Sequence, residues 1–546
     1  MPKQQQIKRP VVTLDTSNQL SLFALKGRAA AKDTQAVKPK GVSFNDPDPR
    51  CILLNGVCLD EHLMRTGEKS ALKVRQLLQE QSWLEFEAAY APGGRPPYAP
   101  RAMTGLILYG IMRGITSLRD LEQFARMDLG CMWVSGGILP DHSIIGRFIQ
   151  RHADYLTEAF FVSLTRQVLR ITGSGTQTVS GDGTVVEAAA SRYRVVKEEA
   201  LQQAVERAQQ GVALEPRDEQ QVQRLEQLQA AAHVLQTRKA AKKAKGKNAD
   251  GMQISAVEPE AMIQPLKDKK SFAPSYKPSV LANAVRVIVA QAVDASSETG
   301  VVAGMLEQAG AQGKIETALF DAGYHCNGVL EATGEREIEL LCPEGQSQGA
   351  SWNKQSEKYY PKSRFQYDTQ RDSYRCPQGQ ELIRLSEYKG SEQYPGYVQY
   401  GTPACERCEQ RSRCTKSVQG RRIKRYAEDA AKELLRDKME KPEVRERYLK
   451  RQGMVEPVFS QLKCRQGLRR FRRKGLKAVR CEFALHAMAY NLSRAMALWA
   501  KDIFRVFSWL LHAVVSDEWR GKTHAFSNGR FCKPMPGNFQ SILVQL

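Results

Sequence analysis

Two short β-prone runs in this chain each end in an aspartate beside a glycine turn. In TVSGDGTVVEA, Asp182 lies between two glycines, and in ALFDAGYH, Asp321 follows an apolar run. Ligands of α/β sheets bind at such strand ends, although a single Asp beside Gly is more often a turn residue. A third acid, Glu456, lies in VEPVFSQLK, a segment with helical spacing. Three carboxylates on two strand ends and a helix predict a site for two Mg²⁺ ions.

Such a site is suited to phosphoryl transfer on DNA. Two ions about 3.5–4 Å apart activate an oxygen nucleophile and stabilise the leaving oxygen, and Mg²⁺ prefers carboxylate ligands; Mn²⁺ is the alternative ion. We expect one Asp to bridge both ions, with the second Asp and Glu456 each completing one shell. Pro457 predicts that a helix begins near Glu456. Lys463 lies two turns further along the same face, within reach of a phosphate.

Strands and helices alternate through the middle of the chain. The expected strands are Val285–Asp294, Ile315–Phe320 and Ile338–Cys342, with helices at Val301–Ala309 and Asn327–Thr333 between them. This alternation predicts an α/β fold, with a mixed or parallel sheet flanked by helices.

A helical region precedes the sheet, over about residues 46–170. The breaker APGGRPPYAPR leads into the apolar helix Met103–Arg113, followed by helices in SLRDLEQFARM and, after a turn at Gly136–Pro140, SIIGRFIQRH. The last helix exposes Arg147 and Arg151. A helix-turn-helix DNA reader has this pattern, and an ordinary helical bundle with a basic face explains it equally well.

Two segments interrupt the sheet pattern. Residues 192–270 are rich in Glu, Gln, Ala and Lys and predict a charged helical hairpin, whereas residues 343–425 are polar and rich in turns. The second segment contains four cysteines, and four thiolates form a closed tetrahedral Zn²⁺ site. Such a site stabilises a small segment that has little core. The alternative is four free thiols, or a site that has lost its metal. The cysteines of this second segment are Cys376, Cys405, Cys408 and Cys414.

The chain is strongly basic, with 81 Lys and Arg against 59 Asp and Glu and a formal net charge of +22. The run from Lys463 to Arg480 contains nine Lys or Arg and no acid. Such density favours binding to DNA phosphates over a solvated charged face. The residues expected to contact DNA are Arg147, Arg151, Lys463, Arg465, Arg469, Arg470, Arg472, Arg473 and Lys474.

At these residues the chain resembles the DDE transposases of bacterial insertion sequences, in the subgroup with a tyrosine-arginine-glutamate-lysine signature. The matching segments are GRPPYAPRAM with the helices after it, SGDGTVVEA, EPEA with SYKPS, ALFDAGYH, and Tyr448 through Asn491. The signature reads Y-x2-R-x4-E-x6-K, one residue longer between Arg and Glu than the usual form. Its members are Tyr448, Arg451, Glu456 and Lys463.

The resemblance implies a ribonuclease-H-like catalytic domain over residues 171–500, with Asp182, Asp321 and Glu456 as the metal-binding triad. It also implies DNA contacts from Tyr448 and Arg451. The implied function is that of a transposase, a homo-oligomer, with a dimer on paired ends. Such an enzyme binds the terminal inverted repeats of its element, cleaves the DNA ends and joins the 3′-OH to target DNA. Two alternatives are a nuclease of the same fold without strand transfer, and a DNA-binding protein derived from a transposase.

The ends of the chain are expected to be tails, a polar and basic one at 1–45 and a weakly patterned one at 501–546. Within the first tail, Met1–Pro10 is polar and basic and has no apolar core typical of a secretory signal. The run Val506–Val515 is too short to span a bilayer. The 12 cysteines are mostly scattered, which argues against a disulfide framework. These features predict a cytoplasmic, nucleoid-associated protein.

Overall fold

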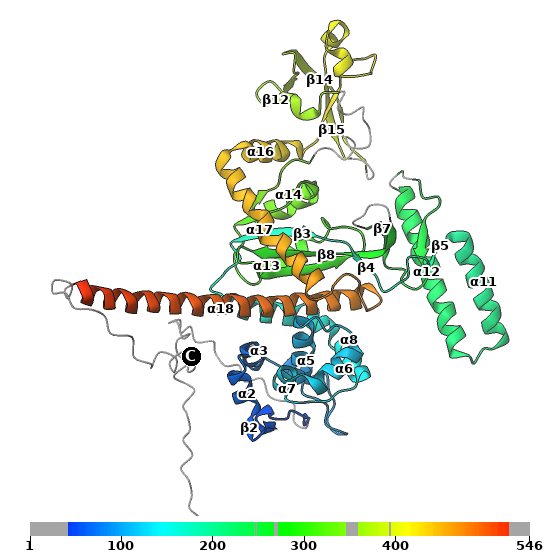
Figure 1. Ribbon diagram of the computed structural model, residues 1–546. Helices are drawn as coiled ribbons and strands as arrows, with labels where there is room; N and C mark the ends of the chain where they lie inside the picture. The colour runs from blue at the N-terminus through cyan, green and yellow to red at the C-terminus, as the bar shows by residue number, and fades with distance from the viewer. Residues whose placement is uncertain are drawn as a thin grey trace, which may run out of the picture.

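The computed structural model describes residues 42–244, 246, 248–266, 271–345, 359–391 and 395–523, with side chains described as far as residue 499. A helical part, a central sheet and a smaller five-stranded sheet follow one another from bottom to top in Figure 1, and a helical hairpin projects from the side of the central sheet. No helix within these ranges has the combined length and apolar character that a membrane span requires.

The helical part is built around α5 (Pro100–Met112), which is buried along almost its whole length. Glycine permits this close packing, since a Cβ at Gly110 would lie 2.2 Å from the side chain of Leu121. Ser117 caps the next helix and Asp141 caps α8, as their side chains accept backbone N–H groups of the first turns. The other elements are η2 (Pro49–Cys51), β1 (Leu53–Leu54), β2 (Val57–Cys58), α2 (Leu59–Arg65), α3 (Lys69–Gln79), α4 (Leu84–Glu87), α6 (Leu118–Met127), α7 (Leu129–Ser135), α8 (His142–Arg151), α9 (Ala153–Thr157) and α10 (Ala159–Ile171).

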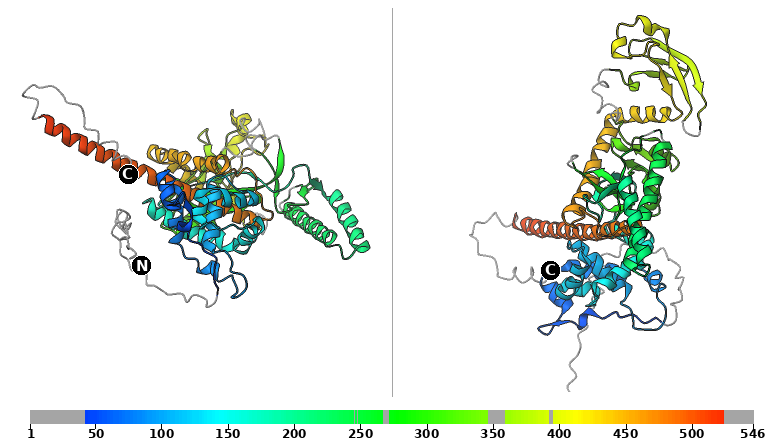
Figure 2. Two further views of the ribbon diagram at one scale, coloured as in Figure 1. Left: turned by 60° about the horizontal axis from the view of Figure 1, so that its bottom comes forward. Right: turned by 90° about the vertical axis from the view of Figure 1, so that its right-hand side faces the viewer.

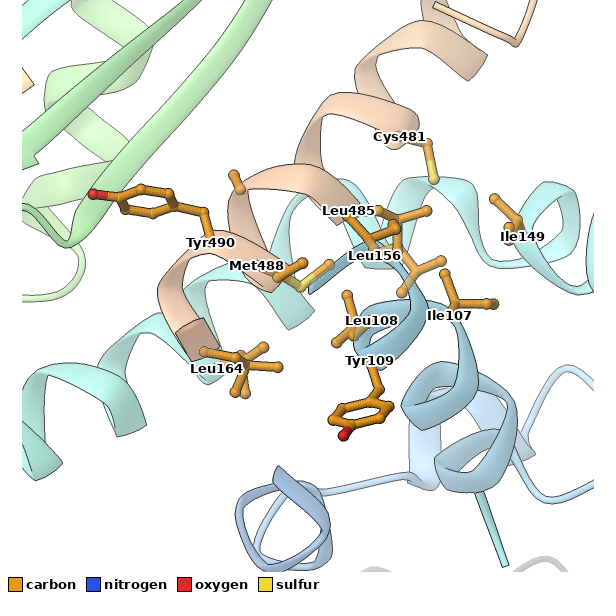
Figure 3. Close-up of a cluster of buried hydrophobic side chains, with 14 of the residues drawn as sticks. Ile107, Leu108, Tyr109, Ile149, Leu156, Leu164, Cys481, Leu485, Met488 and Tyr490 are labelled. Carbon is orange, nitrogen blue, oxygen red and sulfur yellow. The ribbon is translucent and has the colours of Figure 1, made fainter. Parts of the chain in front are cut away.

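The helix α18 (Leu476–Thr523) joins the helical part to the sheet. Leu485 and Met488 of α18 point toward Leu108 and Leu156 of the helical part in Figure 3, within one continuous hydrophobic core. On the sheet side, the buried Asn491 accepts the N–H of Ile288 and donates to its carbonyl. The sheet and the helices therefore share one core. The sequence places a tail from residue 501, whereas α18 continues to Thr523; residues 1–41 and 524–546 lie outside the described ranges.

The central sheet has seven strands in the order β11-β10-β3-β8-β4, with β7 and β9 also paired to β8. β3, β10 and β11 are parallel, whereas β8 is antiparallel to β3 and β9, so the sheet is mixed and the chain is α/β as predicted. The strands are β3 (Thr178–Gly183), β4 (Val186–Glu187), β7 (Met262–Pro265), β8 (Phe272–Asn283), β9 (Ile288–Asp294), β10 (Thr317–Leu319) and β11 (Glu339–Leu341); the helices between them are α13 (Val302–Gly310) and α14 (Asn327–Gly334), with η3 (Ala322–Tyr324).

β8, the longest strand of this sheet, is absent from the strands predicted by the sequence. It contains Pro274 and Pro278, which lack the N–H that a central strand uses for its ladder. Their carbonyls still accept hydrogen bonds, since Ala188 N donates to Pro274 O and Thr184 N to Pro278 O. α7 was also missed, and β7, inside the predicted insertion 192–270, belongs to the central sheet.

Two segments project from the sheet (Figures 1 and 2). The first is the hairpin of α11 (Glu198–Leu214) and α12 (Glu219–Ala244), which is flanked in the chain by the paired strands β5 (Val195–Lys197) and β6 (Gln253–Ser255). The second is an antiparallel sheet in sequence order with a small core that includes Tyr374 and Tyr400. Its elements are η4 (Lys362–Arg364), β12 (Gln366–Asp368), β13 (Ser373–Arg375), β14 (Glu381–Tyr388), β15 (Tyr397–Gly401), η5 (Pro403–Arg407), η6 (Arg411–Arg413) and β16 (Ile423–Arg425).

The chain returns to the central sheet through α16 (Asp429–Glu440) and α17 (Pro442–Cys464). The prediction that a helix begins near Glu456 is wrong, because Pro457 lies inside α17. Proline removes one backbone hydrogen bond from a helix interior. The buried stripe of Val455, Val458 and Leu462 packs onto the sheet and maintains the helix through this position.

Candidate active site

Asp182 and Asp321 lie at the same level at the ends of neighbouring parallel strands. The register pairs Leu319 of β10 with Ser180 of β3, and each aspartate follows its paired residue by two positions. Because parallel strands end at one edge of a sheet, this register brings the two carboxylates to one place. The sequence predicted both strand ends correctly, while their pairing comes from the structure.

Local backbone contacts hold each aspartate. Asp182 Oδ1 accepts from the N–H of Gly183 at 2.9 Å, and Asp321 Oδ1 accepts from the N–H of Gly323 at 2.9 Å. Gly181 allows the ring of Phe320 to lie against β3, since a Cβ there would be 2.1 Å from the Phe320 ring. Gly181 is therefore required by packing beside the aspartate, within strand β3.

Arg451 of α17 lies between the two carboxylates. Its Nη2 is 3.6 Å from Asp182 Oδ1 and 3.9 Å from Asp321 Oδ2, and it donates to the carbonyl of Gly181 at 3.4 Å. Only 11% of the Arg451 side chain is exposed. A largely buried guanidinium thus faces both strand ends and partly neutralises them.

The site still contains excess negative charge. Burial raises the pKa of Asp182 to about 6; Arg451 lowers this pKa, and Asp321 and Glu298 raise it. Glu298, which the sequence did not single out, packs over Gly183, where an added Cβ would lie 2.7 Å from its Cγ. Its carboxylate pairs with Lys277 at 3.3 Å. Carboxylate oxygens that remain incompletely neutralised are the donor set that a divalent cation prefers, so Asp182 and Asp321 fit such an ion.

Glu456 is exposed on α17 and accepts from Gln452 Nε2 at 3.1 Å. Five residues separate it from Arg451, which places the two side chains about 140° apart around the helix. Within the described ranges, no three His, Cys, Asp or Glu side chains are arranged to hold a metal ion. The two aspartates are therefore brought together at their strand ends, and Glu456 stands apart from them on the helix.

The flank of α17 that carries Glu456 faces the end of β3. Lys463, two turns beyond Glu456 on the same flank, donates to Thr184 Oγ1 at 2.5 Å and to the Val185 carbonyl at 3.2 Å. These acceptors directly follow Gly183 in the chain. The ring of Tyr448 is half-buried and packs against a small core that includes the ends of β10 and β11. Its surroundings therefore differ from those of Lys463.

The basic run after α17 is fixed to the sheet through its backbone. Glu187 N donates to Arg469 O, and Phe471 N donates to Glu187 O at 2.8 Å, so the run pairs with β4. The buried carboxylate of Glu482 accepts the N–H groups of Arg472 and Arg473. These contacts hold a dense group of cations close to the strand that carries Asp182.

Three arginines of the run donate to groups elsewhere in the protein; one of them, Arg480, donates through Nε to the Val293 carbonyl at 3.1 Å. Arg470 Nε donates to the Ala188 carbonyl at 3.0 Å, and Arg472 Nε donates to Thr116 Oγ1 at 2.9 Å. Arg473 is partly buried beside Glu482. The exposed members Arg465, Arg469 and Lys474 remain the members best placed to meet a phosphate backbone.

Arg147 and Arg151 are exposed on α8, whose opposite face is buried at Ile145, Phe148 and Ile149. α7 lies between α6 and α8 along the chain and ends at Gly136, in the left-handed conformation. This arrangement is compatible with a helix-turn-helix and with a helical bundle that has a basic face.

Cys376, Cys405, Cys408 and Cys414 line one small cavity beside the five-stranded sheet. All four are free thiols, and the pKa of Cys414 is raised by burial and by the other three cysteines. The structure therefore places the four predicted cysteines around one cavity. In the described ranges, however, no group of His, Cys, Asp or Glu side chains is positioned to hold a metal ion, and this includes the four cysteines.

Two family models match the chain. Residues 375–496 match the model described as "Transposase DDE domain", and residues 63–151 match "Transposase domain (DUF772)". The first match contains Glu456, Lys463 and the basic run, and the second extends from α2 to the end of α8. No curated protein matches the sequence. DDE transposase domains typically use divalent metals such as Mg²⁺. The two matches, on parts of the chain that share one core, support the assignment of this protein to the DDE transposases of insertion sequences.

Proposed function

We propose that the chain is a DNA transposase that binds the terminal inverted repeats of its element, cleaves the DNA ends and joins the freed 3′-OH to target DNA. The observation that carries this proposal is the pairing of Asp182 and Asp321 at adjacent parallel strand ends, on either side of Arg451. It acts as a homo-oligomer, a dimer on paired ends, in the cytoplasm and on the nucleoid. The central sheet is then a ribonuclease-H-like catalytic domain.

Asp182, Asp321 and Glu456 are the residues that would hold the divalent cations. Bound there, a pair of Mg²⁺ or Mn²⁺ ions supplies activation of water or of a 3′-OH and stabilises the leaving oxygen. Arg451 partly offsets the mutual repulsion of the two neighbouring carboxylates. Lys463 holds the α17 flank at the end of β3 and presents an ammonium group beside the bond to be broken.

The basic run positions DNA over this edge of the sheet. Its backbone is anchored to β4 and to Glu482, so the exposed cations are held in place before DNA arrives. Contacts between cations and phosphates position a duplex without reading its sequence. On this proposal, Arg147 and Arg151 contribute a second basic surface on the helical part.

Strand transfer with pre-cleaved ends tests the proposal. Duplexes that end in a 3′-OH at the element's terminal repeat are incubated with the protein, Mg²⁺ and a supercoiled target plasmid. A transposase yields end–target joint molecules. Cleavage of uncut ends without any joint molecules supports the nuclease alternative, and binding without either reaction supports the DNA-binding alternative.

We also propose that Cys376, Cys405, Cys408 and Cys414 hold a structural Zn²⁺ ion. The shared cavity supports this, because four thiols gather on turns of a segment that has a small core. Elemental analysis of protein purified without added metal should give about one zinc per chain. The variant Cys405→Ser with Cys408→Ser should lose zinc, whereas Cys464→Ser, an exposed cysteine at the end of α17, should retain it. Wild-type protein without zinc would exclude the site.

A further inference from the structure

A second concave site lies on the helical part, between the loop at residues 91–98 and α8. Its volume is about 280 Å³. The loop is fixed on its outer side, since Asn45 N donates to Pro97 O at 2.8 Å and Ala99 N donates to Asn45 O at 3.0 Å. Tyr98 OH also donates to the Leu139 carbonyl at 3.1 Å. The cavity is thus formed by a braced loop against a packed helix.

The walls of this cavity are flat and apolar. They include the rings of Tyr90, Pro96, Pro97, Tyr98 and Phe148. Aromatic faces of this kind stack on nucleobases of any sequence, because every base has a π face. Apolar walls offer no favourable contact to a phosphate group alone, and a base paired inside a duplex cannot reach them.

The rim of the cavity is positively charged. Arg95, Arg147 and Arg151 line it, all three are exposed, and no Asp or Glu does. None of the three forms an ion pair within the described part of the chain. The Arg151 guanidinium lies over the Tyr90 ring, 4.7 Å from its centroid. The rim therefore offers three exposed cations next to a stacking surface.

We propose that this cavity binds one unpaired nucleotide of a DNA strand. The base packs between the tyrosine rings and the prolines, and the flanking phosphates contact Arg95, Arg147 and Arg151. The inference rests on the proposed DNA function and extends it. It assigns the helical part a role in holding a single-stranded or frayed strand, apart from the acidic strand ends.

The test compares two single strands that differ only in their bases. A fluorescein-labelled thymidine oligonucleotide of about 12 nucleotides, and the same strand with abasic residues at its centre, are titrated with the full chain by fluorescence anisotropy. EDTA is present, so that no cleavage occurs. The intact strand should bind about tenfold more tightly, because base–aromatic stacking is lost from the abasic strand. Equal affinities would mean that only phosphates are bound, and the proposal would be wrong.

Matched arginine variants locate the effect. Arg147→Ala with Arg151→Ala should weaken the binding of both strands, because the phosphates on either side of the bound nucleotide lose their cations. This variant should also lower the slope of log affinity against log salt by about 0.7 for each arginine. Arg119→Ala, an exposed arginine of α6 outside the cavity, should bind both strands like wild type. Wild-type affinity of the double variant for both strands, or an equal loss in Arg119→Ala, would contradict the assignment.

The result of this binding test can be distinguished from the result of the strand-transfer test of the proposed function. The variant Asp321→Asn changes the acidic site and leaves the cavity intact, so it should keep the wild-type preference for the intact strand. If strand transfer fails while this preference is present and binding depends on Arg147 and Arg151, the nucleotide site stands without the transposase reaction. If strand transfer succeeds and the preference is absent, only the nucleotide site is refuted.

Discussion

Two regions of this protein gather side chains of the kind that bind metals, and they do so in different ways. Asp182 and Asp321 are placed by the register of two parallel strands inside a core shared with α18. The four cysteines lie on turns and short 3₁₀ segments next to a small sheet. The first arrangement does not depend on a ligand. The second has little packing of its own, so we expect it to depend on a metal for its order.

The largest expected effect is a loss of DNA cleavage when the strand-end acids are changed, with the fold retained. Asp182→Asn, Asp321→Asn and Glu456→Gln should each lower the rate of end cleavage by about a thousandfold or more, equivalent to about 4 kcal/mol of barrier. Each change removes one ligand charge and keeps the side-chain size. Cleavage of a labelled end duplex in Mg²⁺ measures the rate, and circular dichroism melting measures the fold.

The matched control is Glu446→Gln, an exposed acid of α17 away from the strand ends, which should cleave at the wild-type rate. Near-normal cleavage by any one of the three test variants removes that residue from the ligand set. Glu456→Gln is the most informative variant, because Glu456 is the only one of the three acids that does not lie beside Arg451.

The second effect is local unfolding of the cysteine region. Cys405→Ser with Cys408→Ser should make residues 359–425 sensitive to limited chymotrypsin digestion, because the turns lose their metal clip. The central sheet and α18 should stay resistant, since their core does not include these thiols. Mass spectrometry of the fragments locates the cuts. Cys464→Ser is the control. If the double variant resisted chymotrypsin as well as the wild type does, packing alone would order this region.

The third effect is on DNA affinity. Arg465→Ala with Arg469→Ala should weaken binding to all duplexes alike and lower the slope of log affinity against log salt by about 0.9 for each lost contact. Both side chains are exposed on the run anchored to β4. Filter binding at several salt concentrations measures the slope. Arg224→Ala, on the projecting hairpin, is the control; a changed sequence preference with an unchanged slope would mean that the run reads bases.

The smallest effect is on the pH dependence of stability without metal. The pKa of Asp182, raised by burial to about 6, lies above its unfolded value, so the folded state binds the proton more tightly. The contribution of this group is therefore present at low pH and is lost as the pH rises from about 4 to about 6. In EDTA, Asp182→Asn should melt a few degrees higher than wild type at pH 7 and at a similar temperature at pH 4. An equal difference at both pH values would show that Asp182 is ionised throughout.

The sequence predicted the acidic strand ends well and their surroundings poorly. The β-prone run that carries Asp182 and the apolar run before Asp321 are local signals, and both strands form where these runs lie. β8 was missed because Pro274 and Pro278 oppose strand formation locally, whereas pairing on both sides of the strand decides the structure. Pro457 was misread for the same reason, since burial of α17 outweighs one lost hydrogen bond.

Other features had no local signal at all. Glu298 lies 116 residues from Asp182 in the chain and reaches it only because β9 and β3 flank β8 in the sheet. The contact of Lys463 with Thr184 spans 279 residues. The four cysteines that the spacing grouped line one cavity; Cys405, Cys408 and Cys414 are close together in sequence, whereas Cys376 is brought to them by the five-stranded sheet.

Binding of a divalent cation to the free protein tests most directly whether the strand-end carboxylates form a metal site. Mn²⁺ is titrated into the full chain without DNA, and bound ion is followed by the loss of its free electron paramagnetic resonance signal. Wild-type protein should bind Mn²⁺, and Asp182→Asn with Asp321→Asn should bind none at the same concentrations, while Cys405→Ser with Cys408→Ser binds as wild type does. Equal Mn²⁺ binding by wild type and the double aspartate variant would contradict the account.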